Sequence, residues 1–473
     1  MSVVADPTRD GGEVERSEER RARPDVRRAV LLASGLPALA ILAASFVQTE
    51  LLHGSWDRLN AIISVGNPVR SNVNDALPAM EAARALLETP GAPIYDMSRT
   101  DSAAFLYPPI AAALYVPHVL AGDDALWSLV SWNRVVFVLI ALLLLGALVG
   151  PARRWPKPVE VLGVAAAMVL FLPAARALEL NQASLYVGLF VGAAWVALDR
   201  GAEATAGVLL ACAGAVKPHM FAVAPLLFFH ARRAAVSAAV AGGGLLAASI
   251  AFAGLPNHVT YVTHVLPEAS RGYAFFPNQS FGGMLHRLLS DVPLDTFELM
   301  PANPLVMRAT LVVGAVLYGV TFVVLLRARG RRDLAREAFA VGWLVTTMIA
   351  PIAWGHHYVA ALFPLAWLVG RVRDGVERSA ARLAPVAIGC ALVGSYFVVD
   401  GLRGAGARLL ASYGLFGALL AAGALAWRLV QAGGSLAGND SRLASSTCAS
   451  PASSSAVSSS AVSSSAVSSS PPA

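Results

Sequence analysis

A few charged and polar side chains interrupt an otherwise apolar sequence, and they are the first candidates for chemistry. Lys217 stands inside the apolar run GVLLACAGAVKPHMFAVAPLLFF, directly before Pro218. A buried ammonium requires an anionic partner or a polar cavity, so Lys217 is expected to contact a phosphate or a carboxylate. The alternative interpretation is that its long side chain reaches a polar interface from a helix end.

A second candidate is the histidine pair of the segment WGHHY, which lies between two apolar runs. His356 and His357 are suited to hydrogen bonding with a phosphate or a sugar. A zinc site would need further ligands at a recognisable spacing, and the sequence offers none, so no metal is predicted. The alternative is that the two histidines merely cap the start of a helix.

Amide side chains mark two further segments. RALELNQASLY contains Gln182, and FFPNQSFGGMLHRLL contains Asn278 and Gln279. An amide both donates and accepts hydrogen bonds, as the recognition of sugar hydroxyls requires. Amides also occur in ordinary turns, and the sequence leaves both interpretations open.

The elements that must position these residues begin with the segment DALPAMEAARALLE, from Asp75 to Glu88. Its apolar residues recur at helical spacing, which predicts an amphipathic helix on a membrane surface, with Asp75 at the N-cap. Whether Asp75 only caps the helix or also reacts stays open. Further along, Tyr107 precedes two prolines, which remove two backbone donors and predict a rigid, non-helical corner.

The composition is that of a polytopic membrane protein. Of the 473 residues, 56% are hydrophobic and 14% are charged, and the mean hydropathy is +0.60. Apolar runs long enough to cross a bilayer recur between residues 29 and 430, and they predict 11–13 membrane segments. The net charge of +6 comes mostly from loop arginines and does not indicate nucleic-acid binding. The three cysteines are far apart and indicate no disulfide framework.

Arginine clusters orient the predicted spans. Residues 1–28 are polar and basic, and we expect them to stay in the cytoplasm without being cleaved as a signal peptide. The membrane domain then covers residues 29–430, with external loops at about 53–103 and 254–303. Residues 204–230 are predicted to form a hairpin of two short helices. Residues 431–473 form a Ser-rich tail that is expected to be disordered.

The order of these motifs resembles the family-87 glycosyltransferases of the GT-C class. An aspartate heads an amphipathic helix, and Tyr-Pro-Pro, Asn-Gln, a Lys-Pro hairpin, Asn-Gln-Ser and Trp-x-His-His follow. The resemblance runs from about residue 75 to residue 367. It implies an all-α, GT-C-like membrane enzyme in a bacterial plasma membrane, with its active site on the external, periplasmic side. The implied partners are a polyprenyl-phosphate sugar donor, a glycolipid or glycan acceptor of the cell envelope and the lipid bilayer. No cofactor is implied, and the sugar is mannose first and arabinofuranose second.

The resemblance also implies residue roles. Asp75 would be the general base of an inverting transfer, because an acceptor hydroxyl must lose its proton as it attacks the sugar. Positive groups would stabilise the departing phosphate, and the candidates for this role are Lys217, His356, His357 and Arg271. The candidates for contacts with the sugar or the acceptor are Tyr107, Gln182, Asn278 and Gln279.

Two other classes of function remain. A transporter or flippase of lipid-linked sugars would share the spans, the lysine and a cavity. It would not need a carboxylate at the membrane edge, and such proteins often show internal repeats, of which the sequence has no convincing example. A non-catalytic scaffold for envelope synthesis is the third possibility.

Overall fold

The computed structural model describes residues 11–54, 74–95, 104–149, 156–377, 379–397, 399 and 404–446. Within these ranges all regular elements are helices, and the only β-type pairings are two isolated bridges. The predicted all-α class is therefore confirmed. The centre of the first external loop and most of the predicted Ser-rich tail lie outside the described residues.

The helices fall into two sets along the chain. The first half contains α1 (Gly11–Phe46), η1 (Val47–Leu52), α3 (Leu77–Glu88), η3 (Pro109–Tyr115), α4 (Val116–Val119), η4 (Gly122–Asp124), α5 (Ala125–Leu148), α6 (Pro158–Leu170), α7 (Leu172–Glu179), α8 (Ser184–Asp199), α9 (Glu203–Val216), η5 (Pro218–Ala222) and α10 (Val223–Leu227). The second half contains α11 (Arg232–Ala253), α12 (Leu255–Thr260), η6 (Tyr261–Val265), α13 (Leu266–Ala269), α14 (Phe281–Leu289), α15 (Pro304–Arg327), η7 (Arg332–Leu334), α16 (Ala335–Ile349), η8 (Gly355–Ala361), α17 (Leu362–Arg373), α18 (Ala380–Val393), α19 (Ala405–Leu410) and α20 (Tyr413–Ser446).

Several helices are long and apolar enough to cross a membrane. In the described part of the chain, five pass this test, and the pair α6–α7, bent by 64°, is a sixth candidate. Other predicted segments are shorter apolar helices, among them α8, α18 and the pair α9 and η5–α10. This pair supplies the two short helices expected in residues 204–230, but α9 packs mainly on α8 and α11, whereas α10 packs on α11 and α16. Helix α20 continues to Ser446, past residue 430 where the disordered tail was predicted to begin.

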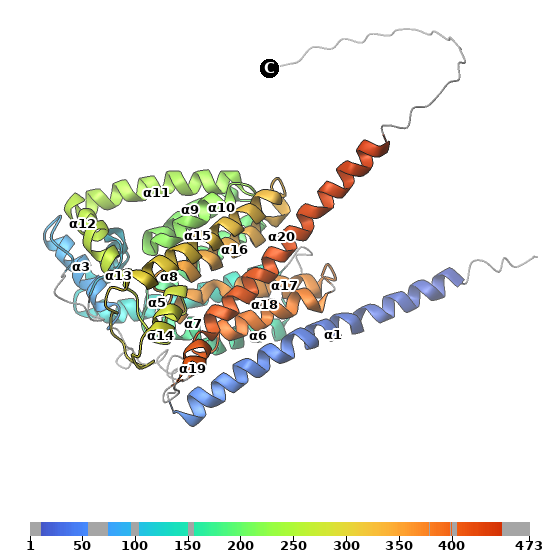
Figure 1. Ribbon diagram of the computed structural model, residues 1–473, viewed down its shortest axis with the longest axis horizontal. Helices are drawn as coiled ribbons and strands as arrows, with labels where there is room; N and C mark the ends of the chain where they lie inside the picture. The colour runs from blue at the N-terminus through green and yellow to red at the C-terminus, as the bar shows by residue number, and fades with distance from the viewer. Residues whose placement is uncertain are drawn as a thin grey trace, which may run out of the picture.

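The loop helices gather at one end of the helical bundle. Figure 1 shows α3, α12, α13 and α14 at this end, while α1 and α20 extend from the opposite end. The two predicted external loops therefore meet in space. Asn257 joins them directly: its amide accepts from the backbone N–H of Ile94 at 3.2 Å and donates to the carbonyl of Ala92 at 2.8 Å.

Helix α3 has the amphipathic character that its sequence predicts. Its buried residues are Pro78, Ala79, Met80, Ala82, Ala83 and Leu86, and they join a cluster with η3 and the start of α5. Burial of this face removes apolar surface from water, at roughly 25 cal/mol per Å². It fixes the start of α3, and so the residues just before it, against the membrane domain.

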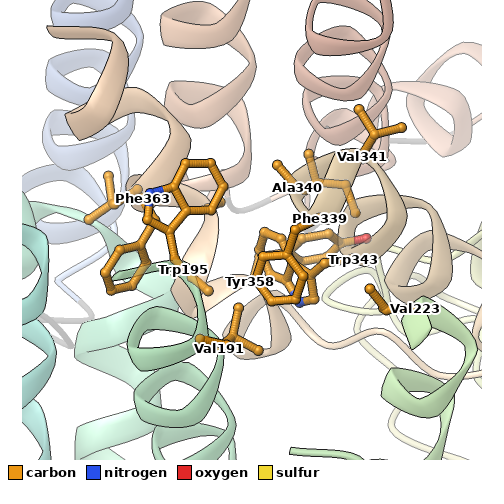
Figure 2. Close-up of a cluster of buried hydrophobic side chains, with 14 of the residues drawn as sticks. Val191, Trp195, Val223, Phe339, Ala340, Val341, Trp343, Tyr358 and Phe363 are labelled. Carbon is orange, nitrogen blue, oxygen red and sulfur yellow. The ribbon is translucent and has the colours of Figure 1, made fainter. Parts of the chain in front are cut away.

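The main core lies between α8, α16, η8 and α17. Figure 2 shows Trp195 of α8 and Phe363 of α17 on one side of this layer, with Phe339, Trp343 and Tyr358 packed beside them. A Cβ on Gly192 of α8 would come within 2.2 Å of Phe363, so only glycine permits this approach. Because η8 is buried in this core, the two histidines that it carries have fixed positions.

Candidate active site

A cavity of 610 Å³ opens where the loop helices meet the membrane domain. Its wall contains aromatic and apolar side chains with a smaller number of polar groups, as ligand pockets generally do. The polar and charged side chains that line it include Asp75, Tyr107, Arg176, Gln182, Lys217, His219, His356 and His357. Seven of the nine residues predicted from the sequence as site candidates line the cavity: six are in this group, and the seventh is Gln279.

Asp75 lies in the turn that precedes α3, and it is half-buried. The expectation that it caps this helix is wrong. The N-cap residue is Ala76, and no side chain makes a capping hydrogen bond there. The carboxylate of Asp75 instead accepts a hydrogen bond from Nε2 of Gln182. Asp75 is thus turned away from its own helix and toward the cavity.

Burial raises the pKa of Asp75 above the usual value for an aspartate. The hydrogen bond from Gln182 and the positive charges of Arg176 and Lys217 oppose this shift, but desolvation is the largest effect. A carboxylate with a raised pKa holds a proton more tightly once it has accepted one. That property suits a general base.

Gln182 reaches the cavity because the chain turns sharply at the end of α7. Asn181 has a φ of 51°, in the left-handed region that asparagine tolerates better than most residues. The N–H of Gln182 bonds to the carbonyl of Ala177 at 2.9 Å, and the N–H of Asn181 bonds to that of Leu178 at 3.2 Å, which is a Schellman motif. The amide of Asn133 in α5 donates to the side chain of Asn181 at 3.1 Å.

Tyr107 stands at the rigid corner that the prolines predict. Its hydroxyl donates to Oε1 of Gln182 at 2.9 Å, and its backbone carbonyl accepts from the hydroxyl of Tyr95 at 2.8 Å. Pro108 is the N-cap residue of η3, so the chain is extended here and turns helical only after the tyrosine. The corner therefore fixes Tyr107 in the cavity wall.

Lys217 occupies the break between α9 and η5. Since Pro218 disfavours a helical conformation at the residue before it, α9 ends at Val216 and Lys217 is extended, with φ −129° and ψ 99°. Its Nζ lies 2.7 Å from Nε2 of His357 and 5.0 Å from the centroid of the Tyr107 ring. Among the described residues, Lys217 makes no ion pair with a carboxylate.

Three imidazoles lie together on the side of this ammonium where His357 contacts it. The ring centroid of His357 lies 5.0 Å from that of His356 and 6.4 Å from that of His219. A lysine ammonium only donates, so Nε2 of His357 is the acceptor and its ring is neutral. Within the described ranges, no three His, Cys, Asp or Glu side chains come close enough together to hold a metal ion.

The structure does not bring the remaining sequence candidates to the cavity as ligand-binding groups. Asn278 is buried behind the wall, where its amide bonds to the backbone of Tyr273 and Ala353 at 3.0 and 2.9 Å. Gln279 lines the cavity, but its amide is bonded to three backbone groups, those of Phe276, Ala411 and Leu415. Both amides therefore tie the second external loop to neighbouring elements, Asn278 to the segment before η8 and Gln279 to the turn before α20 and the first turn of that helix.

Arg271 is likewise engaged elsewhere. It pairs with Glu268, and its Nε donates to the carbonyl of Met300 at 2.8 Å. It is not one of the residues that line the cavity. Sequence reasoning missed two groups that do line it, the guanidinium of Arg176 and the imidazole of His219. His219 follows Lys217 and Pro218, so the same helix break that identified the lysine pointed to it as well.

Comparison with known proteins agrees with this architecture. The model of glycosyltransferase family 87 matches residues 105–351, a little over half of the chain. This match includes Tyr107, Gln182 and Lys217, whereas Asp75 precedes it and His356 and His357 follow it. No curated protein and no solved structure matches the chain. The chain belongs to glycosyltransferase family 87 and is a membrane glycosyltransferase.

Proposed function

We propose that this enzyme transfers a sugar from a polyprenyl-phosphate donor to a glycolipid or glycan acceptor of the cell envelope, with inversion at the anomeric carbon. Mannose is the first candidate sugar, and arabinofuranose is the second. The observation that carries the proposal is that Asp75 and Lys217 face the same cavity. A carboxylate to accept a proton and a cation to receive a phosphate are the two groups that this reaction needs.

In the proposed step, the acceptor hydroxyl attacks the anomeric carbon while Asp75 takes its proton. The bond between that carbon and the phosphate oxygen breaks, and polyprenyl phosphate leaves with the bonding electrons. Lys217 carries the positive charge that stabilises this anion. Arg176 lies in the same cavity wall, but its guanidinium is paired with the carboxylate of Glu179 at 2.6 Å. His356 lines the same cavity, while His357 accepts from Lys217 and holds its ammonium in place.

A lipid-linked donor is supported by the surface beside the cavity. The segment from α12 to α13 starts where the candidate span α11 ends, and Leu255, Val259, Val262 and Leu266 are between 40% and 60% exposed on it. Their spacing places them on one side of a helix. Leu266 and Tyr261, which faces inward, also line the cavity. An apolar helix face at the end of a span suits contact with lipid chains.

The sidedness of the reaction is also part of the proposal. The arginines at the ends of α11 and α15 favour a cytoplasmic location for those ends, and they leave the loop between these helices on the opposite side. The cavity would then open at the external, periplasmic face of a bacterial plasma membrane. A lipid-linked donor suits that face, because its polyprenyl chain keeps it in the bilayer while the sugar is presented at the surface.

The test uses the full-length enzyme reconstituted in liposomes with extracted envelope lipids. Radiolabelled polyprenyl-phosphate mannose and polyprenyl-phosphate arabinofuranose are supplied separately, and a nucleotide sugar serves as the third arm. We expect a labelled lipid product with one polyprenyl-phosphate donor, and at least about 10²-fold slower turnover in Asp75→Asn. Product formation from the nucleotide sugar alone would overturn the proposed donor class.

A further inference from the structure

Tyr107 and Gln182 were both expected to contact the sugar or the acceptor, but their hydrogen bonds run in another direction. The hydroxyl of Tyr107 donates to Oε1 of Gln182 at 2.9 Å, and Nε2 of Gln182 donates to Oδ2 of Asp75. The three side chains come from the corner before η3, the turn after α7 and the turn before α3. They form one chain of hydrogen bonds that ends at the proposed base.

The chemistry of the groups fixes the direction of this chain. An ionised carboxylate only accepts, so Gln182 must turn its NH₂ toward Asp75. Its carbonyl oxygen then faces the other way and needs a donor, which the hydroxyl of Tyr107 supplies. If the amide were flipped, its oxygen would oppose the carboxylate. Tyr107 therefore selects the orientation of Gln182 that stabilises the ionised form of Asp75.

Tyr107 and Gln182 are themselves fixed by contacts with other residues. The Schellman turn at Asn181 sets the backbone of Gln182. The backbone carbonyl of Tyr107 accepts from the hydroxyl of Tyr95, whose ring stacks on Phe105 with centroids 5.6 Å apart. Such support is the feature that distinguishes a positioned group from one that merely happens to be near.

We propose that Tyr107 and Gln182 are positioning residues for Asp75: the tyrosine hydroxyl orients the amide, and the amide directs Oδ1 of the carboxylate toward the acceptor hydroxyl. This inference rests on the proposed function, in which Asp75 is the base. The hydrogen bond from Gln182 also lowers the pKa of Asp75 against the effect of burial. The two residues thus set both the direction of the base and the pH at which it is ionised.

Tyr107 has a second contact that a test must preserve. The ammonium of Lys217 lies 5.0 Å from the centroid of its ring, within the range of a cation–π interaction. Tyr107→Phe removes only the hydroxyl and leaves the ring face to Lys217. A change in this variant therefore reports on the hydrogen bond to Gln182 and not on the lysine.

The experiment measures kcat, the KM for the polyprenyl-phosphate donor and the pH profile in reconstituted enzyme. We expect Tyr107→Phe to lower kcat by about tenfold or more and to move the acidic limb of the profile to higher pH, with the donor KM little changed. Gln182→Glu, which sets a second carboxyl beside Asp75, is expected to move that limb further in the same direction. Thermal unfolding in detergent identifies variants that have lost the fold.

Tyr115→Phe is the matched control. Tyr115 is a buried tyrosine of η3 whose hydroxyl has no hydrogen-bond partner in the described structure, and it does not line the cavity. We expect this variant to leave kcat and the pH profile unchanged. An equal shift of the pH profile in Tyr107→Phe and Tyr115→Phe would show a general packing effect. It would overturn the assignment of Tyr107 as a positioning residue.

The outcomes separate this inference from the proposed function. A raised KM in Tyr107→Phe with an unmoved acidic limb would make Tyr107 a direct contact of the sugar and overturn the inference alone. The same holds if Asp75→Asn is inactive but neither Tyr107→Phe nor Gln182→Glu moves the limb. If Asp75→Asn keeps normal turnover, the base itself is misassigned: this inference falls, together with the role of Asp75 in the proposed function, whereas the donor class is decided by the labelled donors.

Discussion

The ammonium of Lys217 lies 2.7 Å from Nε2 of His357, although 140 residues separate them in the sequence. The two groups meet because α9 ends at Val216, just before Lys217, and because η8 is packed into the main core. A neutral imidazole satisfies one N–H of the ammonium without cancelling its charge. The positive charge therefore stays available to an anion in the cavity.

Lys217→Met is expected to lower kcat/KM for the polyprenyl-phosphate donor by about 10²-fold or more, because it removes the charge that receives the phosphate. Lys217→Arg should retain part of the activity, since the charge survives in a different geometry. Lys157→Met is the control, because Lys157 is the other lysine of the chain and is exposed. Steady-state rates with equal amounts of reconstituted protein check this prediction. Full activity in Lys217→Met would reduce the residue to a structural role.

The pH dependence of the reaction follows from the raised pKa of Asp75. A base works only when it is deprotonated, so the rate falls as the pH drops through its pKa. The acidic limb is therefore expected above the ordinary aspartate pKa of about 4. Initial rates measured at saturating donor from about pH 4 to about pH 8 locate the limb. A limb at or below the ordinary value would contradict the buried environment of Asp75.

The same shift predicts the effect of Asp75→Asn on stability. A carboxyl whose pKa is higher in the folded than in the unfolded chain costs stability above its unfolded pKa, and it costs less as the pH falls through the folded pKa. Removal of the charge should therefore leave the melting temperature at neutral pH unchanged or raise it. Thermal unfolding in detergent provides this measurement. A large decrease would mean that the loss of turnover in Asp75→Asn reflects a damaged fold.

Features set by neighbouring residues could be predicted from the sequence. The break at Lys217 follows from Pro218, and the corner at Tyr107 follows from the two prolines after it. The helical spacing of apolar residues after Asp75 predicted helix α3. The roles of Asp75, Asn278 and Gln279 could not be predicted in this way. Their hydrogen-bond partners lie far away in the sequence, such as Gln182 for Asp75 at a separation of 107 residues. An amide that binds a sugar and one that binds a distant backbone group look the same in a sequence.

The apolar face from Leu255 to Leu266 predicts a dependence on the lipid chain of the donor. Val262→Glu places a charge on this face, and we expect at least about fivefold slower turnover with a long-chain donor, because contact with lipid is lost. A water-soluble, short-chain donor should be used at the normal rate. Thr263→Glu is the control, since Thr263 is exposed next to Val262 but does not belong to the apolar stripe. Equal losses with both donors would indicate local unfolding instead.

The sidedness of the cavity can be tested on two consecutive spans. Helix α11 begins with Arg232 and α15 ends with Arg327, so both arginine-bearing ends are expected in the cytoplasm, with the loop between the two helices outside. In a variant lacking Cys212, Cys390 and Cys448, a cysteine at the exposed Thr263 should react with an impermeant thiol reagent on intact cells. A cysteine at the exposed Arg329 should react only after permeabilisation.

The opposite labelling pattern would show that the chain has the inverted orientation in the membrane. Asp75 and Lys217 would still share their cavity, because the packing of the loops does not depend on orientation. The donor sugar would then have to be supplied in the cytoplasm, where nucleotide sugars are made and a lipid carrier is not needed to bring the sugar to the active site. External labelling of Thr263 is therefore the result that fits a lipid-linked donor, and internal labelling would remove the main reason for proposing one.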